Sequence, residues 1–115
     1  MRKFKRSVGN AFGGVKYAFR NERNFRYQLL ATAIVIFLMY WFDVTRAEQI
    51  ALWIVICAVL ILELLNTAIE AFADLVKPRL HEQVGIIKDI MASTVLIASI
   101  GALVVGLLIF WPYFL

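Results

Sequence analysis

The chain has 115 residues, of which 63% are hydrophobic and 17% charged, and its formal net charge is +4. An apolar content this high, with only 2 prolines, excludes a disordered chain, and the long uncharged runs argue against a soluble domain. We therefore expect a single all-α membrane domain over 1–115, in which an N-terminal amphipathic surface helix precedes three transmembrane helices.

The first predicted element, 1–24, is a basic amphipathic helix. Its apolar residues fall within an arc of about 100° on a helical wheel, and most of its basic residues lie outside that arc. These apolar residues are Phe4, Val8, Ala11, Phe12, Val15 and Phe19. We expect this helix to lie on the inner leaflet, where anionic headgroups attract basic side chains. It could serve only as an anchor or also take part in binding.

Three later segments are long and apolar enough to be predicted as membrane-spanning helices, since a span needs roughly 20 apolar residues. They cover 25–42, 50–73 and 90–113. The first and third end in aromatic residues, "YWF" and "FWPYFL", which favour the membrane interface.

The basic residues predict the orientation of these spans. Of the 12 lysines and arginines, most precede or open the first span, one follows it, and three lie between the second and third. The positive-inside rule therefore places the N-terminus and the 74–89 loop in the cytoplasm and the C-terminus outside. The net charge is explained by this topology, so we expect no nucleic-acid partner.

The second span contains the polar sequence "ELLNTAIE". On a helix, its polar residues and the aspartate that follows share one stripe roughly 80° wide. They are Glu63, Asn66, Glu70 and Asp74. One such residue could simply hydrogen-bond neighbouring helices. Four in register favour a functional site, because a charge within a span costs about 2.5 to 3.5 kcal/mol even on insertion scales.

Further charged residues are predicted at the same cytoplasmic level. Lys88 and Asp89 open the third span, and Glu22 precedes the first in "NERNFR". Taken one at a time, such residues are usually interfacial anchors. Together with the stripe they suit Mg²⁺ and a polyphosphate, because Mg²⁺ accepts one or two carboxylates and leaves its other positions to phosphate oxygens and water.

These motifs resemble the small prokaryotic diacylglycerol kinase family. The resemblance rests on "NERNFR" before the first span, "ELLNTAIE" followed by Asp74, "KD" at 88–89 and the three-span length. "RNERNF" combined with "LELLNTAIE" is most similar to the undecaprenol kinase branch. The resemblance covers nearly the whole chain.

The resemblance implies a homotrimeric enzyme of the bacterial inner membrane that transfers the γ-phosphate of MgATP to a lipid alcohol. Glu63 matches the general base of the family, and Glu22 and Glu70 match the residues that hold magnesium and the nucleotide phosphates. Asn66 and Asp74 would orient these groups. The further nucleotide contacts implied by the resemblance are Asn10, Arg79, His81, Lys88 and Asp89.

Alternatives remain open at this point. Within the lipid kinases, undecaprenol is the favoured acceptor and diacylglycerol the alternative, which would give phosphatidic acid. Outside them, a small membrane transport or structural subunit also places acids within a span. A transporter, however, needs its acid near the midplane, whereas here the stripe continues to the cytoplasm and the outer half, "IALWIVICAVLIL", carries no charge.

Overall fold

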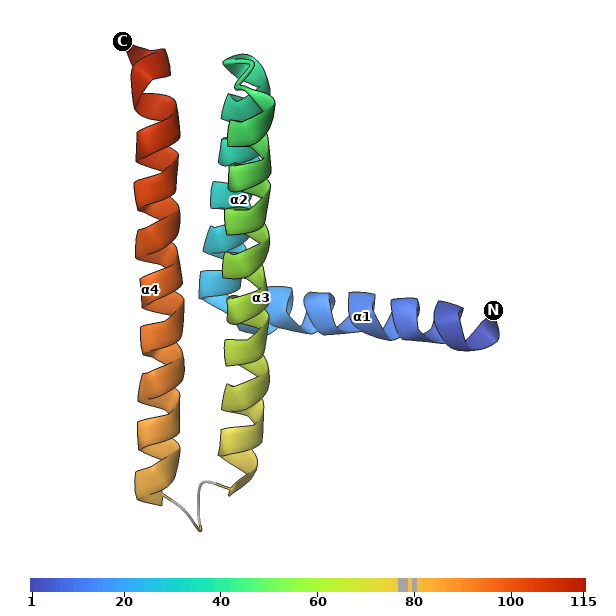
Figure 1. Ribbon diagram of the computed structural model, residues 1–115. Coiled ribbons are helices and arrows are strands. Elements are labelled where there is room, and N and C mark those ends of the chain that lie inside the picture. Colours follow the sequence, from blue (N-terminus) through green and yellow to red (C-terminus); the bar gives the residue numbers. More distant parts are fainter. Residues whose placement is uncertain (77–78, 80) are drawn as a thin grey trace.

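The computed structural model describes residues 1–76, 79 and 81–115, and it confirms the predicted all-α class. The described residues form four helices: α1 (Arg2–Asn21), α2 (Arg23–Trp41), α3 (Arg46–Val76) and α4 (His81–Phe114). Figure 1 shows α3 and α4 as two long helices that lie side by side and run in opposite directions. The shorter α2 lies beside the upper part of α3, and α1 extends sideways.

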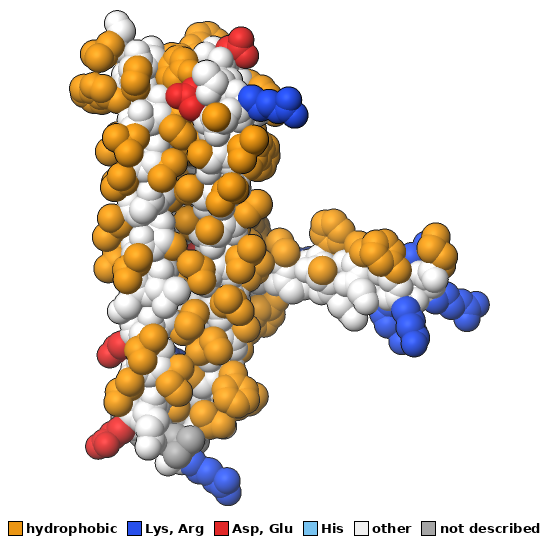
Figure 2. Space-filling view, viewed as in Figure 1, with side chains coloured by type: hydrophobic (Ala, Val, Ile, Leu, Met, Phe, Trp, Pro, Cys, Tyr) orange, Lys and Arg blue, Asp and Glu red, His pale blue; other side chains and the backbone are white. Residues whose placement is uncertain are grey.

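Helix α1 is almost entirely exposed, and Ala18 is its only buried residue. Its hydrophobic side chains gather along one side, and several of its basic side chains lie near the free end (Figure 2), while Arg20 lies in its last turn. The helix is interrupted between α1 and α2 at Glu22, whose backbone is extended. Arg26 fixes this corner, because its guanidinium donates hydrogen bonds to the carbonyl oxygens of Phe19 (2.7 Å) and Arg20 (3.3 Å).

The helices extend beyond the predicted spans, since α3 begins at Arg46 rather than 50 and α4 at His81 rather than 90. The start of α3 has a local cause. The Glu48 amide donates to the Thr45 hydroxyl (3.2 Å), and the Thr45 amide donates to the Glu48 carboxylate (3.0 Å), which is a capping box. Hydropathy marks only the apolar part of each helix, so polar helical ends lie outside the predicted bounds.

The packed core lies at the end of the molecule where α2 turns into α3. Its buried residues are Met39, Leu52, Ile56, Ile109 and Phe110. The Phe42 ring contacts the rings of Phe110, Tyr113 and Phe114, with centroids 4.9 to 6.3 Å apart. The Tyr113 hydroxyl also donates to the Glu48 carboxylate. These contacts fix the end of α4 to the start of α3.

The surface of the helical bundle is largely hydrophobic, with charged groups mostly near its ends (Figure 2). In the part of the chain that the structure describes, α3 and α4 are long and apolar enough to cross a membrane. Monomeric soluble proteins rarely expose so much apolar surface, which indicates a membrane protein. The first turns of α2 are polar, and this helix does not meet the same criterion. Its predicted role as a third span therefore stays a prediction.

Candidate active site

Glu63 is the most deeply buried of the described acidic side chains. Only 1% of its surface is exposed, and neither carboxylate oxygen has a hydrogen-bond partner among the described residues. It faces a cavity of about 330 Å³ whose walls include Asn24 and Gln28 of α2 and Ser99 of α4. Burying a polar group without partners is costly, so this arrangement indicates binding or catalysis rather than a structural role.

The predicted polar stripe on α3 becomes more exposed toward the α3–α4 connection. Glu63 and Asn66 are buried, Glu70 is half-buried and Asp74 is exposed. Thr67, next to the stripe, is also buried, and its hydroxyl donates to the Glu63 carbonyl oxygen (3.0 Å). One face of α3 therefore carries a buried carboxyl group at one end and an exposed carboxyl group at the other.

A close carboxyl pair forms between Glu70 and Glu22, which lies at the corner between α1 and α2. Burial raises the pKa of Glu22 to about 7, and a hydrogen bond with the Glu70 carboxyl and the charges of Glu70 and Glu63 shift it in the same direction. The nearby negative charges therefore favour the protonated form of Glu22. The fold thus gathers acids from two distant segments of the sequence.

This carboxyl pair fits a magnesium ion. Mg²⁺ usually binds to one or two carboxylates and keeps water or phosphate oxygens in its other positions. Its charge would offset the negative charges of Glu22 and Glu70. Among residues 1–76, 79 and 81–115, no group of three or more His, Cys, Asp or Glu could hold a metal ion. A magnesium ion here would therefore complete its shell with phosphate and water.

Lys88 of α4 pairs with Asp74 of α3, with 2.8 Å between the ammonium nitrogen and the carboxylate oxygen. The ammonium also lies within electrostatic range of Glu70. Both side chains of the ion pair are solvent-accessible, so the pair is a weak structural link that a phosphate could displace.

The remaining predicted nucleotide contacts whose side chains the structure describes do not join this cluster. Asn10 and Asp89 are exposed. In the described structure, neither side chain makes a hydrogen bond to the carboxyl groups of the cluster. Arg79 is exposed, and its backbone amide donates to the Val76 carbonyl oxygen (3.1 Å). The side chain of His81 lies outside the described part of the structure.

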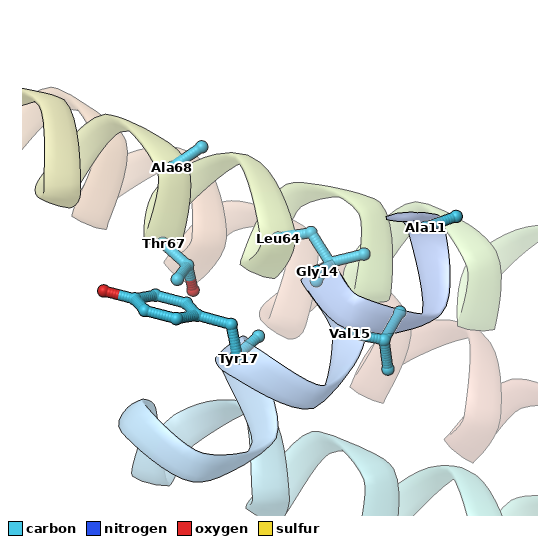
Figure 3. A pocket seen from close by; sticks show the side chains of 8 residues that line it. Ala11, Gly14, Val15, Tyr17, Leu64, Thr67 and Ala68 are labelled. Carbon is cyan, nitrogen blue, oxygen red and sulfur yellow. The ribbon is translucent and has the colours of Figure 1, made fainter. Parts of the chain in front are cut away.

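A second cavity, of about 450 Å³, lies between α1 and α3. Figure 3 shows its small and apolar walls, with the Tyr17 ring next to the Thr67 side chain. The α3 residues that line it are Leu64, Thr67 and Ala68, directly after Glu63. Helix α1 therefore meets α3 at the level of the buried carboxyl group.

A third cavity, of about 370 Å³ and mainly apolar, extends between α2 and α4 as far as Phe110 and Phe114. Gln28 and Ser99 line both this groove and the cavity that contains Glu63. Sequence analysis missed both residues as site components. Their only signal was an uncharged polar residue in each of two apolar segments, which is common at helix contacts.

Comparisons with known proteins give a consistent result. A family model for prokaryotic diacylglycerol kinase matches residues 9–110. The chain is 32% identical over 109 residues to a diacylglycerol kinase of Escherichia coli (strain K12), covering 95% of this chain and 89% of that protein. It is 31% identical over 112 residues to an undecaprenol kinase of Bacillus subtilis (strain 168), covering 97% and 91%. A diacylglycerol kinase of Synechocystis is 41% identical over 97 residues, covering 84% and 55%.

Proposed function

The chain belongs to the prokaryotic diacylglycerol kinase family and is a lipid kinase, and we propose that it transfers the γ-phosphate of MgATP to undecaprenol, giving undecaprenyl phosphate. The observation that carries this proposal is the position of Glu63. Its unpartnered carboxyl group faces a cavity that continues into an apolar groove, and it lies within electrostatic range of Glu22. A lipid alcohol and a metal-bound phosphate can therefore meet there.

Glu63 acts as the general base in this proposal. The lipid hydroxyl oxygen forms a bond to the γ-phosphorus, the bond from that phosphorus to ADP breaks, and the Glu63 carboxylate accepts the hydroxyl proton. The buried setting supports this role, because no group in the described structure donates a hydrogen bond to either carboxylate oxygen, which leaves them available to the hydroxyl. Buried Asn66 lies one turn away and would orient the reacting groups.

The exposed half of the stripe would bind the nucleotide. Glu22 and Glu70 would hold Mg²⁺, which supplies positive charge that neutralises the phosphate oxygens. Lys88 would exchange its contact with Asp74 for a phosphate oxygen, while Asp74 orients it in the resting state. Asn10, Arg79, His81 and Asp89 complete the proposed nucleotide site.

We place the chain in the bacterial inner membrane as one domain with three spans, α2, α3 and α4. α1 would lie on the cytoplasmic surface, with its apolar side in the lipid. Since α1 meets α3 at Leu64–Ala68, the last turns of α3 would then project into the cytoplasm, where MgATP is available. The N-terminus and the active site are cytoplasmic, and the C-terminus is outside.

A homotrimer is also part of the proposal. One chain leaves its cavities open and most of the apolar surface of α4 exposed. Self-association would cover part of this surface.

Diacylglycerol is the second candidate acceptor, and the relatives named diacylglycerol kinase support it. Both acceptors present a hydroxyl group at the membrane surface, so the same residues serve either reaction. The transport or structural alternative loses its support, because this family consists of lipid kinases.

The test is a competition between acceptors. The purified protein is given ATP labelled in the γ-phosphate, magnesium, and equal mole fractions of undecaprenol and dioleoylglycerol in one detergent micelle. The proposal predicts label mainly on undecaprenol. Label mainly on dioleoylglycerol would replace the acceptor and leave the mechanism, and label on neither lipid would contradict the proposed reaction.

A further inference from the structure

α2 and α4 both pack against α3 but do not pack closely against each other. The groove between them is closed at one end by the contacts of Phe42 with Phe110 and Phe114. At the other end, the Gln28 side-chain amide donates to the Ser99 hydroxyl (3.1 Å). In the described structure this is the only side-chain hydrogen bond that joins α2 to α4.

The Gln28–Ser99 pair lies where the cavity that contains Glu63 meets the apolar groove. Both residues line the polar cavity with Glu63 and also the apolar groove. An acceptor whose hydroxyl group reaches Glu63 and whose chain lies in the groove must therefore pass this pair. The pair is half-buried and its donor and acceptor satisfy each other.

We propose that the Gln28–Ser99 hydrogen bond selects acceptors that carry a single chain behind the hydroxyl group, such as a polyprenol, over diacylglycerol. This inference rests on the proposed function. The two side chains are specificity-determining residues, and they do not take part in the chemistry.

The reason is the polar bridge itself. A single chain can lie beside the bonded pair without disturbing it. A 1,2-diacylglycerol carries one acyl chain on the carbon next to its hydroxyl-bearing carbon and the second on the carbon after that, and placing both past the pair separates the amide from the hydroxyl. The separated groups then lose a hydrogen bond, and the apolar acyl chains that lie between them cannot replace it.

The groove beyond the pair has a volume of about 370 Å³ and is lined in part by small residues. Its walls include Ala31, Ala102 and Gly106, and a Cβ added at Gly106 would meet no atom within 4 Å. Side chains of this size leave room for the methyl groups that a polyprenol carries at regular intervals. The groove therefore suits one branched chain.

The test measures kcat/KM for undecaprenol and dioleoylglycerol in the same micelles, using the full-length wild-type protein, Ser99→Ala and the nearly isosteric Gln28→Leu. Loss of the bridge should raise the dioleoylglycerol-to-undecaprenol ratio by about tenfold, the effect of one lost buried hydrogen bond. Ser93→Ala is the matched control, because the Ser93 hydroxyl donates only to the Asp89 carbonyl oxygen of its own helix.

An increased ratio in both variants, with the control unchanged, would support the inference. An unchanged ratio in an active enzyme, or an equal loss with both lipids, would show a purely structural bond and overturn the inference alone. A selective loss of dioleoylglycerol activity would also overturn it, by showing that the pair binds ester groups. A wild-type protein that phosphorylates neither lipid would overturn the proposed function with it.

Discussion

Glu63 and Asp74 lie on the same face of α3 and carry the same chemical group, yet their surroundings differ completely. Glu63 is 1% exposed and has no hydrogen-bond partner among the described residues, whereas Asp74 is exposed and paired with Lys88. About 16 Å of helix separates them. A single polar stripe thus presents a dry carboxyl group at one end and a solvated ion pair at the other.

The difference assigns different chemistry to each end. A buried carboxylate is suited to accept a proton from a lipid hydroxyl, because no described residue donates a hydrogen bond to it. A solvated ion pair is suited to exchange partners with a charged nucleotide. Between them, the Glu22–Glu70 pair is suited to a divalent cation. Each prediction below alters one of these regions or the groove beside them.

The largest effect is expected at the buried end. Glu63→Gln keeps the size of the side chain and removes the base, so kcat should fall by about 10³-fold, within the range for general-base catalysis. The affinity for MgATP should change by less than about threefold, as this carboxyl group does not hold the nucleotide. Steady-state kinetics with nucleotide-binding measurements check both. A variant that keeps near-normal kcat would remove Glu63 from the mechanism.

Glu70→Gln should instead alter the response to magnesium. Removing one of two carboxylate ligands should raise the Mg²⁺ concentration for half-maximal rate by at least about tenfold. The rate at saturating Mg²⁺ should largely recover. A magnesium titration of the variant beside the wild-type protein measures this, and an unaltered titration would place the ion elsewhere.

The raised pKa of Glu22 predicts a pH dependence of magnesium binding. The pKa of Glu22 is raised from 4.5 to about 7, and Mg²⁺ binds to the ionised pair. The Mg²⁺ dissociation constant should therefore rise by about tenfold for each pH unit below 7 and level off above it. Calorimetry from pH 6 to 8 checks the slope.

Glu22→Gln is the control for this titration, since it has no proton to release. Its weaker Mg²⁺ binding should not vary with pH over the same interval. The pH dependence of folding has the opposite sign: without metal, this carboxyl group favours the folded state most below its ordinary pKa of 4.5, and the benefit is lost as the pH rises through about 7. If Glu22→Gln keeps the wild-type dependence of Mg²⁺ affinity on pH, the titrating proton belongs to another group.

A smaller effect is expected in the groove. Gly106→Leu adds a side chain where the structure has open space, so the helix should fold normally while the acceptor loses room. KM for the lipid should rise by about fivefold, with KM for ATP unchanged. Gly101→Leu is the matched control, because Gly101 is exposed, equally open and outside the groove. Equal effects of both substitutions would argue against a chain in the groove.

The smallest effect is expected at the exposed end. Asp74→Asn removes the partner of Lys88, but solvent screens both groups. KM for ATP should change by about twofold, and high salt should reduce the difference further. A loss of turnover as large as that of Glu63→Gln would contradict the division between the two ends.

Much of the fold follows from the sequence. The apolar runs predict the helices, and a spacing of three or four residues predicts the stripe from Glu63 to Asp74. Helix ends were less accurate, because polar residues such as Arg46 are helical for reasons of capping and packing that hydropathy does not register. The number of spans also depends on the bilayer, which composition alone does not describe.

The site was predictable only in part. Acids stand out in an apolar segment because their cost is high, so the sequence singles out Glu63 and Glu70 as candidates. Gln28 and Ser99 were missed, because their importance comes from the gap between α2 and α4, a tertiary feature with no local pattern. Likewise, the contact of Glu22 with Glu70 depends on the corner that Arg26 fixes.

The most direct test of the division is a single-turnover experiment on Glu63→Gln and Glu70→Gln at increasing magnesium. Each variant, loaded with labelled ATP, is mixed with undecaprenol, and the rate of transfer is followed. The account predicts that magnesium restores transfer in Glu70→Gln and fails to restore it in Glu63→Gln, although the latter binds MgATP normally. Rescue of both variants, or of neither, would contradict the assignment of proton removal and metal binding to separate carboxyl groups.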